Sequence, residues 1–130
     1  MIKKMGHVTV LVHDYDEAVE FYRDKVGFEV AEDIDFGPEQ RWVTVHAPEQ
    51  DTMLITFVKA DTEEKKALVG KQAADHVFLT VSTDDCIGDY KQMKEKGVKF
   101  HGGPTDVPWG IEVVFEDLYG NRIDLVEPML

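Results

Sequence analysis

The stretch HVTVLV at residues 7–12 decides the fold, because it returns almost unchanged as HVFLTV at residues 76–81, with histidine first both times. The likeness continues beyond this stretch, as far as Gly27 in the first copy and Gly97 in the second. A repeat on this scale indicates two copies of one supersecondary module, each carrying one histidine at the same place.

Both stretches alternate in the manner of a half-buried strand. In the first copy, Val8 and Val10 fall on one face, whereas His7 and Thr9 fall on the other. We expect the first face to pack under helices and the second to be concave and open, so that His7 and His76 share one site. The positions expected under the helices are Val8, Val10, Val12, Val77, Leu79 and Val81.

The rest of each copy predicts one helix and three further strands. A helical pattern begins after Asp14 and ends at Gly27, and a second covers residues 84–96 and ends at Gly97. The remaining strands are expected at residues 28–34, 41–46, 53–58, 98–101, 111–116 and 122–127, with a loop over residues 102–110.

These elements predict an α+β fold of two tandem βαβββ modules, which form an eight-stranded, cup-shaped, partly open barrel with the helices outside. Module one covers about residues 1–60 and module two about residues 74–130, with a polar linker at about residues 61–73. Each half alone would leave long sheet edges unpaired, so we expect residues 1–130 to form a single domain.

Composition limits the partners and the compartment. The 26 acidic residues outnumber the 14 basic ones, giving a net charge of −12, and no basic patch is visible, which argues against nucleic acid. No run is long and apolar enough for a membrane helix, so no membrane partner is expected. The single cysteine, Cys86, fits a reducing, cytoplasmic location. Acidic neighbours should raise the pKa of Cys86, which argues against a catalytic thiol.

Three segments of the chain form a recognisable set: HVTV at residues 7–10 with Asp14, AVEFY at residues 18–22 with Gly27 and Phe28, and DLYGNRIDLVEP at residues 117–128. They resemble the vicinal oxygen chelate superfamily, which includes glyoxalase I, extradiol dioxygenases, fosfomycin-modifying enzymes and bleomycin-resistance proteins. The resemblance covers essentially the whole chain and implies a homodimer. Because the superfamily hosts many reactions on one scaffold, it predicts the fold far better than the activity.

The resemblance also implies a divalent metal, Fe, Mn, Ni or Zn, bound by the first and last strand of each module. His7, His76 and Asp124 match ligand positions, whereas Met53 stands where some members carry a fourth ligand. Methionine is a poor ligand for a hard ion, which disfavours glyoxalase I chemistry and leaves two histidines and one carboxylate. From the residues alone, Asp124 could instead pair with Arg122, and both histidines could be structural.

Apolar and aromatic residues suggest a ligand pocket. Met53, Ile55 and Phe57 alternate along one expected strand, and we add Phe78 and Trp109 to this candidate pocket. One hypothesis is a metal-dependent lyase, dioxygenase or transferase that acts on a small organic molecule. The alternative is a metal-free small-molecule binding protein of the bleomycin-resistance type.

Overall fold

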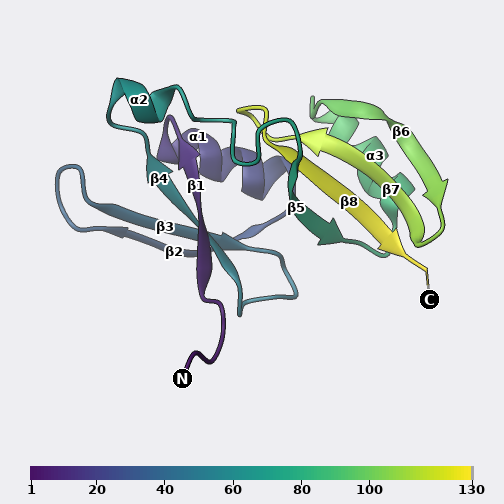
Figure 1. Cartoon of the computed structure of the whole chain (residues 1–130), viewed down its shortest axis with the longest axis horizontal. Coiled ribbons are helices and arrows are strands. Elements are labelled where there is room, and N and C mark those ends of the chain that lie inside the picture. Colours follow the sequence, from purple (N-terminus) through teal and green to yellow (C-terminus); the bar gives the residue numbers. More distant parts are fainter. Residues whose placement is uncertain (130) are drawn as a thin grey trace. The chain divides into compact units, whose positions relative to one another are not determined.

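The structure is a computed structural model that describes residues 1–129. The chain divides into two compact units, Met1–Val69 and Gly70–Leu130, and each contains its own four-stranded sheet (Figure 1).

The first unit builds its sheet from strands that are far apart in the sequence. Its elements are β1 (His7–Val12), α1 (Tyr15–Glu20), the π-helical turn η1 (Phe21–Lys25), β2 (Glu29–Asp35), β3 (Arg41–His46), β4 (Leu54–Lys59) and the short α2 (Glu63–Lys66). The strand order is β1-β4-β3-β2, with β1 parallel to β4 and the other neighbours antiparallel.

The second unit repeats this arrangement. Its elements are β5 (Val77–Ser82), α3 (Cys86–Glu95), β6 (Phe100–Val107), β7 (Gly110–Glu116) and β8 (Arg122–Pro128). The strand order is β5-β8-β7-β6, which corresponds strand for strand to the first sheet. The α+β class and the two βαβββ modules are therefore confirmed. Within residues 1–129, every helix is too short or too polar to span a membrane.

One face of each sheet is covered by helices. In the first unit, Val10, Val12 and Phe57 are buried there, and the Phe57 ring lies 5.2 Å from that of Tyr22 in η1. The prediction of helix-covered valines is confirmed for Val10 and Val12.

The prediction is wrong for the valines near the start of each first strand, since Val8 and Val77 are each 37% exposed. Val77 lies opposite Arg122, whereas Leu79 lies opposite the buried Ile123. The shift in pairing between Val77 and Leu79 therefore leaves Val77 on the face opposite the helix.

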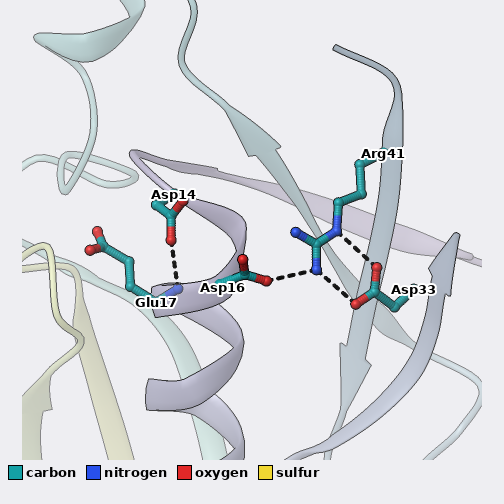
Figure 2. A network of polar contacts seen from close by, with 5 residues as sticks. All are labelled: Asp14, Asp16, Glu17, Asp33 and Arg41. Atoms are coloured by element: carbon teal, nitrogen blue, oxygen red, sulfur yellow. Dashed lines mark hydrogen bonds and ion pairs between the residues drawn. The ribbon is translucent and has the colours of Figure 1, made fainter. Parts of the chain in front are cut away.

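The first helix is capped and held to its sheet by charged side chains (Figure 2). Asp14 accepts a hydrogen bond from the backbone N–H of Glu17 at 2.9 Å, which satisfies one free donor of the first turn. Arg41 in β3 donates to Asp33 in β2 and to Asp16 in α1, each at 2.8 Å. The hydrogen bond from Arg41 lowers the pKa of Asp33. This network links the first turn of α1 to two strands.

The closing motif at residues 117–128 builds the turn between β7 and β8. The buried Asp117 carboxylate accepts hydrogen bonds from the backbone of Tyr119 at 2.9 Å and Asn121 at 3.0 Å, and from the Asn121 amide at 2.9 Å. The Asn121 side-chain oxygen then accepts a hydrogen bond from the backbone of Gln72 at 3.0 Å. These bonds explain why Asp and Asn are needed at these positions of the turn.

The prediction of a loop over residues 102–110 is wrong, because β6 continues to Val107. The pairing shifts between His101, opposite Val114, and Thr105, opposite Glu112. Such an irregularity absorbs extra residues while pairing continues, and an edge strand tolerates the missing N–H of Pro104. Turn-forming residues here therefore bend a strand and do not end it.

Candidate functional site

The face of the second sheet opposite α3 carries polar side chains. Asp124 in β8 lies opposite Val114 in β7 and Thr80 in β5, and Glu112 is two positions from Val114 along β7. Near the end of β7, Glu116 lies 2.7 Å from the His101 ring nitrogen Nε2. Acidic groups therefore line the centre of this face.

Asp124 has an unusual environment within this face. Its Oδ1 atom is buried and has no hydrogen-bond partner. Burial raises the pKa of Asp124 to about 6, and a hydrogen bond and repulsion from the Glu112 carboxyl add to the effect. Arg122 does not provide the pairing considered from the sequence, because its guanidinium donates to the backbone carbonyl of Asp75 at 2.7 Å.

The two predicted histidine ligands have different surroundings. His7, the exposed first residue of β1, packs edge-on against Trp42 with ring centroids 5.3 Å apart. His76 precedes β5, its side chain is 86% exposed, and its Nε2 lies 3.7 Å from the Asp75 carboxylate. Neither ring is buried in its own unit.

The donor chemistry of His7, His76 and Asp124 suits a divalent metal ion. His7 belongs to the first unit, whereas His76 and Asp124 belong to the second. Among residues 1–129, no three histidine, cysteine, aspartate or glutamate side chains are grouped so that they could hold a metal ion. The three-residue ligand set therefore stays a prediction.

The expected apolar pocket needs a correction in the first unit. Ile55 pairs with Val8 and Phe57 pairs with Val10, so both lie on the same face of the sheet as Val8 and Val10 of β1. Both are buried, and Phe57 packs against Tyr22, which makes them core residues and not pocket residues. Met53 lies just before β4 and is half-buried.

The pocket candidates of the second unit are more accessible. Phe78 is half-buried at the point where the pairing of β5 with β8 becomes irregular. Trp109 is exposed in the turn between β6 and β7, and its indole N–H donates to Glu112 at 3.4 Å. Their contact with a ligand stays a prediction.

Sequence reasoning missed Glu112, the carboxyl beside Asp124. The signal was present, because Glu112 and Glu116 alternate with buried residues along the predicted strand at 111–116 and must share the opposite face. What the sequence does not reveal is the pairing of β7 with β8, which brings Glu112 close to Asp124.

Cys86 lies in surroundings that disfavour a reactive thiol. It is buried at the start of α3, and its Sγ atom contacts the carbonyl oxygen of Leu125 at 3.7 Å. Burial raises the pKa of the Cys86 thiol, and the charge of Glu127 raises it further. A thiol in such surroundings is a poor nucleophile.

Comparisons with known proteins agree with this architecture. The sequence model of the glyoxalase/bleomycin resistance protein/dioxygenase superfamily matches residues 4–125. An uncharacterized protein of Shewanella frigidimarina (strain NCIMB 400) is 39% identical over 129 residues, covering 98% of this chain and 95% of that protein.

Two crystal structures are similar over nearly their full length. UcmS2 has a TM-score of 0.84 and 30% identity, covering 98% of this chain and 99% of that one. TnmS3, an antibiotic binding protein from Streptomyces sp. CB03234, has a TM-score of 0.79 and 30% identity, covering 98% of both chains.

Proposed function

Because this chain belongs to the glyoxalase/bleomycin resistance protein/dioxygenase superfamily, we propose that it binds a small organic molecule without a metal ion. The likeness to TnmS3, an antibiotic binding protein with 30% identity over 98% of the chain, supports a binding role. The proposed recognition group is the pair of carboxyls Asp124 and Glu112.

The observation that carries this proposal is the unpartnered, buried Oδ1 atom of Asp124 beside Glu112. A buried acceptor without a partner is costly, and a ligand that donates a hydrogen bond would remove that cost. At pH 7, above its pKa of about 6, Asp124 is largely ionised, so donors and cations are preferred. The net charge of −12 also disfavours anionic ligands.

Three related probes test the proposal: 2-naphthylmethylamine, 2-naphthol and 2-naphthoate, which carry a cation, a neutral donor and an anion on one ring system. Calorimetric titration of EDTA-treated protein should give the tightest binding for the amine and the weakest for the naphthoate. Asp124→Asn should weaken amine binding about tenfold or more, the loss expected for a charge-assisted hydrogen bond.

Glu95→Gln is the matched control, because Glu95 is an exposed carboxylate on α3 and the same charge is removed. This variant should bind the amine like the wild type. Binding that appears only after a divalent metal is added would contradict the metal-free proposal. Binding that favours the naphthoate would contradict recognition by the two carboxyls.

A metal-dependent enzyme is the second candidate, and the same Oδ1 atom favours it. An ionised carboxylate with one oxygen atom free of hydrogen bonds is a good ligand for a hard cation, and His7 and His76 would add two imidazoles. When bound, such an ion would polarise oxygen atoms of a substrate. In this proposal, Asp124 and both histidines would hold the ion and leave positions open for that substrate.

Elemental analysis separates the two candidates. The protein is purified without a metal-binding tag, loaded in turn with Fe(II), Mn(II), Ni(II) and Zn(II), and freed of excess ion. One ion per chain that is lost in His7→Ala, His76→Ala and Asp124→Ala would replace the metal-free proposal. A wild type that retains none of the four ions removes the enzyme candidate.

A further inference from the structure

Tyr90 in α3 has a lysine ammonium at its phenolic oxygen. Lys94 follows it by four residues, and residues with this spacing face each other on one side of a helix. The Lys94 Nζ atom donates a hydrogen bond to the Tyr90 hydroxyl oxygen at 3.1 Å, and it lies 5.3 Å from the centre of the Tyr90 ring. The cation is therefore close to the atom of the phenol that can react.

The Tyr90 ring is held in place by the second sheet. It packs edge-on against Phe100 in β6, with ring centroids 4.7 Å apart, and Phe100 lies 5.7 Å from the buried Phe115 in β7. Edge-to-face contacts between aromatic rings have a preferred geometry, so they restrict the orientation of each ring. The Tyr90 hydroxyl therefore keeps a defined position beside Lys94.

Gly103 in β6 leaves the Tyr90 hydroxyl uncovered on one side. A Cβ atom added at Gly103 would lie 4.0 Å from the hydroxyl oxygen, which is an ordinary contact distance. The φ angle of Gly103 lies outside the left-handed region, so the backbone does not require glycine at this position. The effect of glycine here is to leave room for another molecule next to the hydroxyl.

These features together favour a nucleophilic phenol. Tyrosine attacks electrophiles when a neighbouring group stabilises the negative charge that develops on its oxygen, and an ammonium at hydrogen-bond distance does this strongly. The surrounding segment is also the least hostile to anions. Residues 90–99 contain four lysines and one glutamate, whereas the whole chain has a net charge of −12.

We infer that Tyr90 is a site of covalent modification by an electrophile that carries a negative charge. The phenolic oxygen forms a bond to the electrophilic atom, the bond from that atom to its leaving group breaks, and the leaving group departs with the electron pair. The phenolic proton passes to solvent water, while Lys94 keeps its protons and stabilises the charge on the oxygen. The inference is independent of the proposed function, because α3 and Asp124 lie on opposite faces of the second sheet.

The test uses 4-(fluorosulfonyl)benzoate, an anionic reagent, and benzenesulfonyl fluoride, its neutral counterpart. With either reagent an S–O bond forms and fluoride leaves, and mass spectrometry of peptides locates the modified residue. Under limiting reagent, Tyr90 should react about tenfold faster than Tyr15 and Tyr119, which are half-buried as Tyr90 is. The preference for the anionic reagent should also be greater at Tyr90.

Tyr15 is the informative internal reference, because it also has a cation nearby but in a different place. The Arg41 guanidinium lies over the Tyr15 ring, 5.4 Å from its centre, whereas the Tyr15 hydroxyl accepts a hydrogen bond from the backbone N–H of Lys59 at 3.4 Å. A cation over the ring does not stabilise charge on the oxygen as a direct hydrogen bond does. Tyr15 should therefore react slowly with both reagents.

Three variants separate the contributions of charge and access. Lys94→Met should slow modification of Tyr90 about tenfold, the loss expected for a charge-assisted hydrogen bond, and Lys94→Arg should retain most of the rate. Lys91→Met is the matched control, because it removes the same charge next to Tyr90 but on a different side of the helix, and it should have little effect. Gly103→Val adds bulk beside the hydroxyl and should slow both reagents equally.

Thermal unfolding of the unmodified variants separates reactivity from a structural role of the pair. An exposed pair at this spacing contributes little to stability, so Lys94→Met should melt close to the wild type. A lower melting temperature with an unchanged rate at Tyr90 would show that the pair serves only the helix, and would overturn the inference. Modification of Lys94 in place of Tyr90, or of Tyr90 no faster than Tyr15 and Tyr119, would overturn it as well.

Discussion

Asp124 is a candidate binding residue that lies in an unfavourable environment for a charged group. Its carboxyl occupies the ligand position implied by the resemblance, yet its immediate neighbour is another carboxyl, Glu112. Its buried Oδ1 atom has no partner. A group in this situation opposes folding when it is ionised.

Stability should therefore depend on pH through Asp124. The folded-state pKa of about 6 lies above the unfolded value of about 3.9, so the folded chain binds more protons between these values. The free energy of unfolding should fall as pH rises through this window. Above pH 6, Asp124→Asn should be more stable than the wild type by about 1 kcal/mol, after allowance for solvent screening.

Urea unfolding of the wild type and Asp124→Asn at pH 4 and pH 8 measures this effect, with Glu95→Gln as the control for a lost surface charge. The advantage of Asp124→Asn should be present at pH 8 and largely absent at pH 4. A variant that is less stable than the wild type at pH 8 would mean that Asp124 has a stabilising partner.

Arg41 illustrates a different balance, in which exposed charges are well paired. Arg41→Met should lower the free energy of unfolding by about 1 kcal/mol, because the guanidinium joins Asp16 in α1 to Asp33 in β2 (Figure 2). Arg23→Met is the matched control, since Arg23 forms an ion pair with the adjacent, exposed Asp24 and should show no measurable loss. Equal losses in urea unfolding would contradict a linking role for Arg41.

At the scale of elements, local patterns predicted the existence and order of the strands and helices. The strand at 41–46 has the predicted bounds, and Gly27 and Gly97 take the positive φ values, 89° and 88°, expected of residues that end helices. The face of the sheet on which a side chain lies was predicted less well. The prediction placed Ile55 and Phe57 on the open face, whereas they lie on the helix-covered face. The pairing of β4 with β1, which is distant in sequence, sets this face.

The candidate site was predictable only in part, for the same reason. The position of Asp124 follows from the resemblance, but the nearness of Glu112 depends on the pairing of β7 with β8. No local pattern encodes this register.

We expect two glycines with positive φ to differ in the stability that is lost when each is replaced by alanine. Gly97, at φ 88°, follows α3 in open space, so Gly97→Ala should cost about 1 kcal/mol for the left-handed backbone alone. Gly110, at φ 147°, begins β7, and an added Cβ would overlap the backbone oxygen of Glu127 in β8. Gly110→Ala should therefore cost about 3 kcal/mol or more.

Thermal unfolding of the two glycine variants checks this difference. If both lose the same stability, the backbone at Gly110 adjusts without disturbing the pairing of β7 with β8, and the overlap is relieved at little cost. A larger loss for Gly110→Ala supports a close, rigid approach of the two strands.

At the scale of the whole molecule, the resemblance implies a homodimer. Multi-angle light scattering at several protein concentrations should give the mass of two chains. A mass of one chain at all concentrations would exclude the homodimer.

The two compact units pose the last question, which is whether either can fold alone. Each has a buried core, with Tyr22 and Phe57 in the first unit and Phe115 and Ile123 in the second. However, a chain of about 60 residues buries only about 60% of its unfolded surface, which is marginal for independent folding. In a separate fragment, the edge strands of the sheet would also be exposed to solvent. We therefore expect fragments 1–69 and 70–130, expressed separately, to lack a cooperative thermal transition measured by circular dichroism. A sharp transition in both fragments would make each unit a domain in its own right and would contradict the single-domain prediction, whereas structure that appears only on mixing would support it.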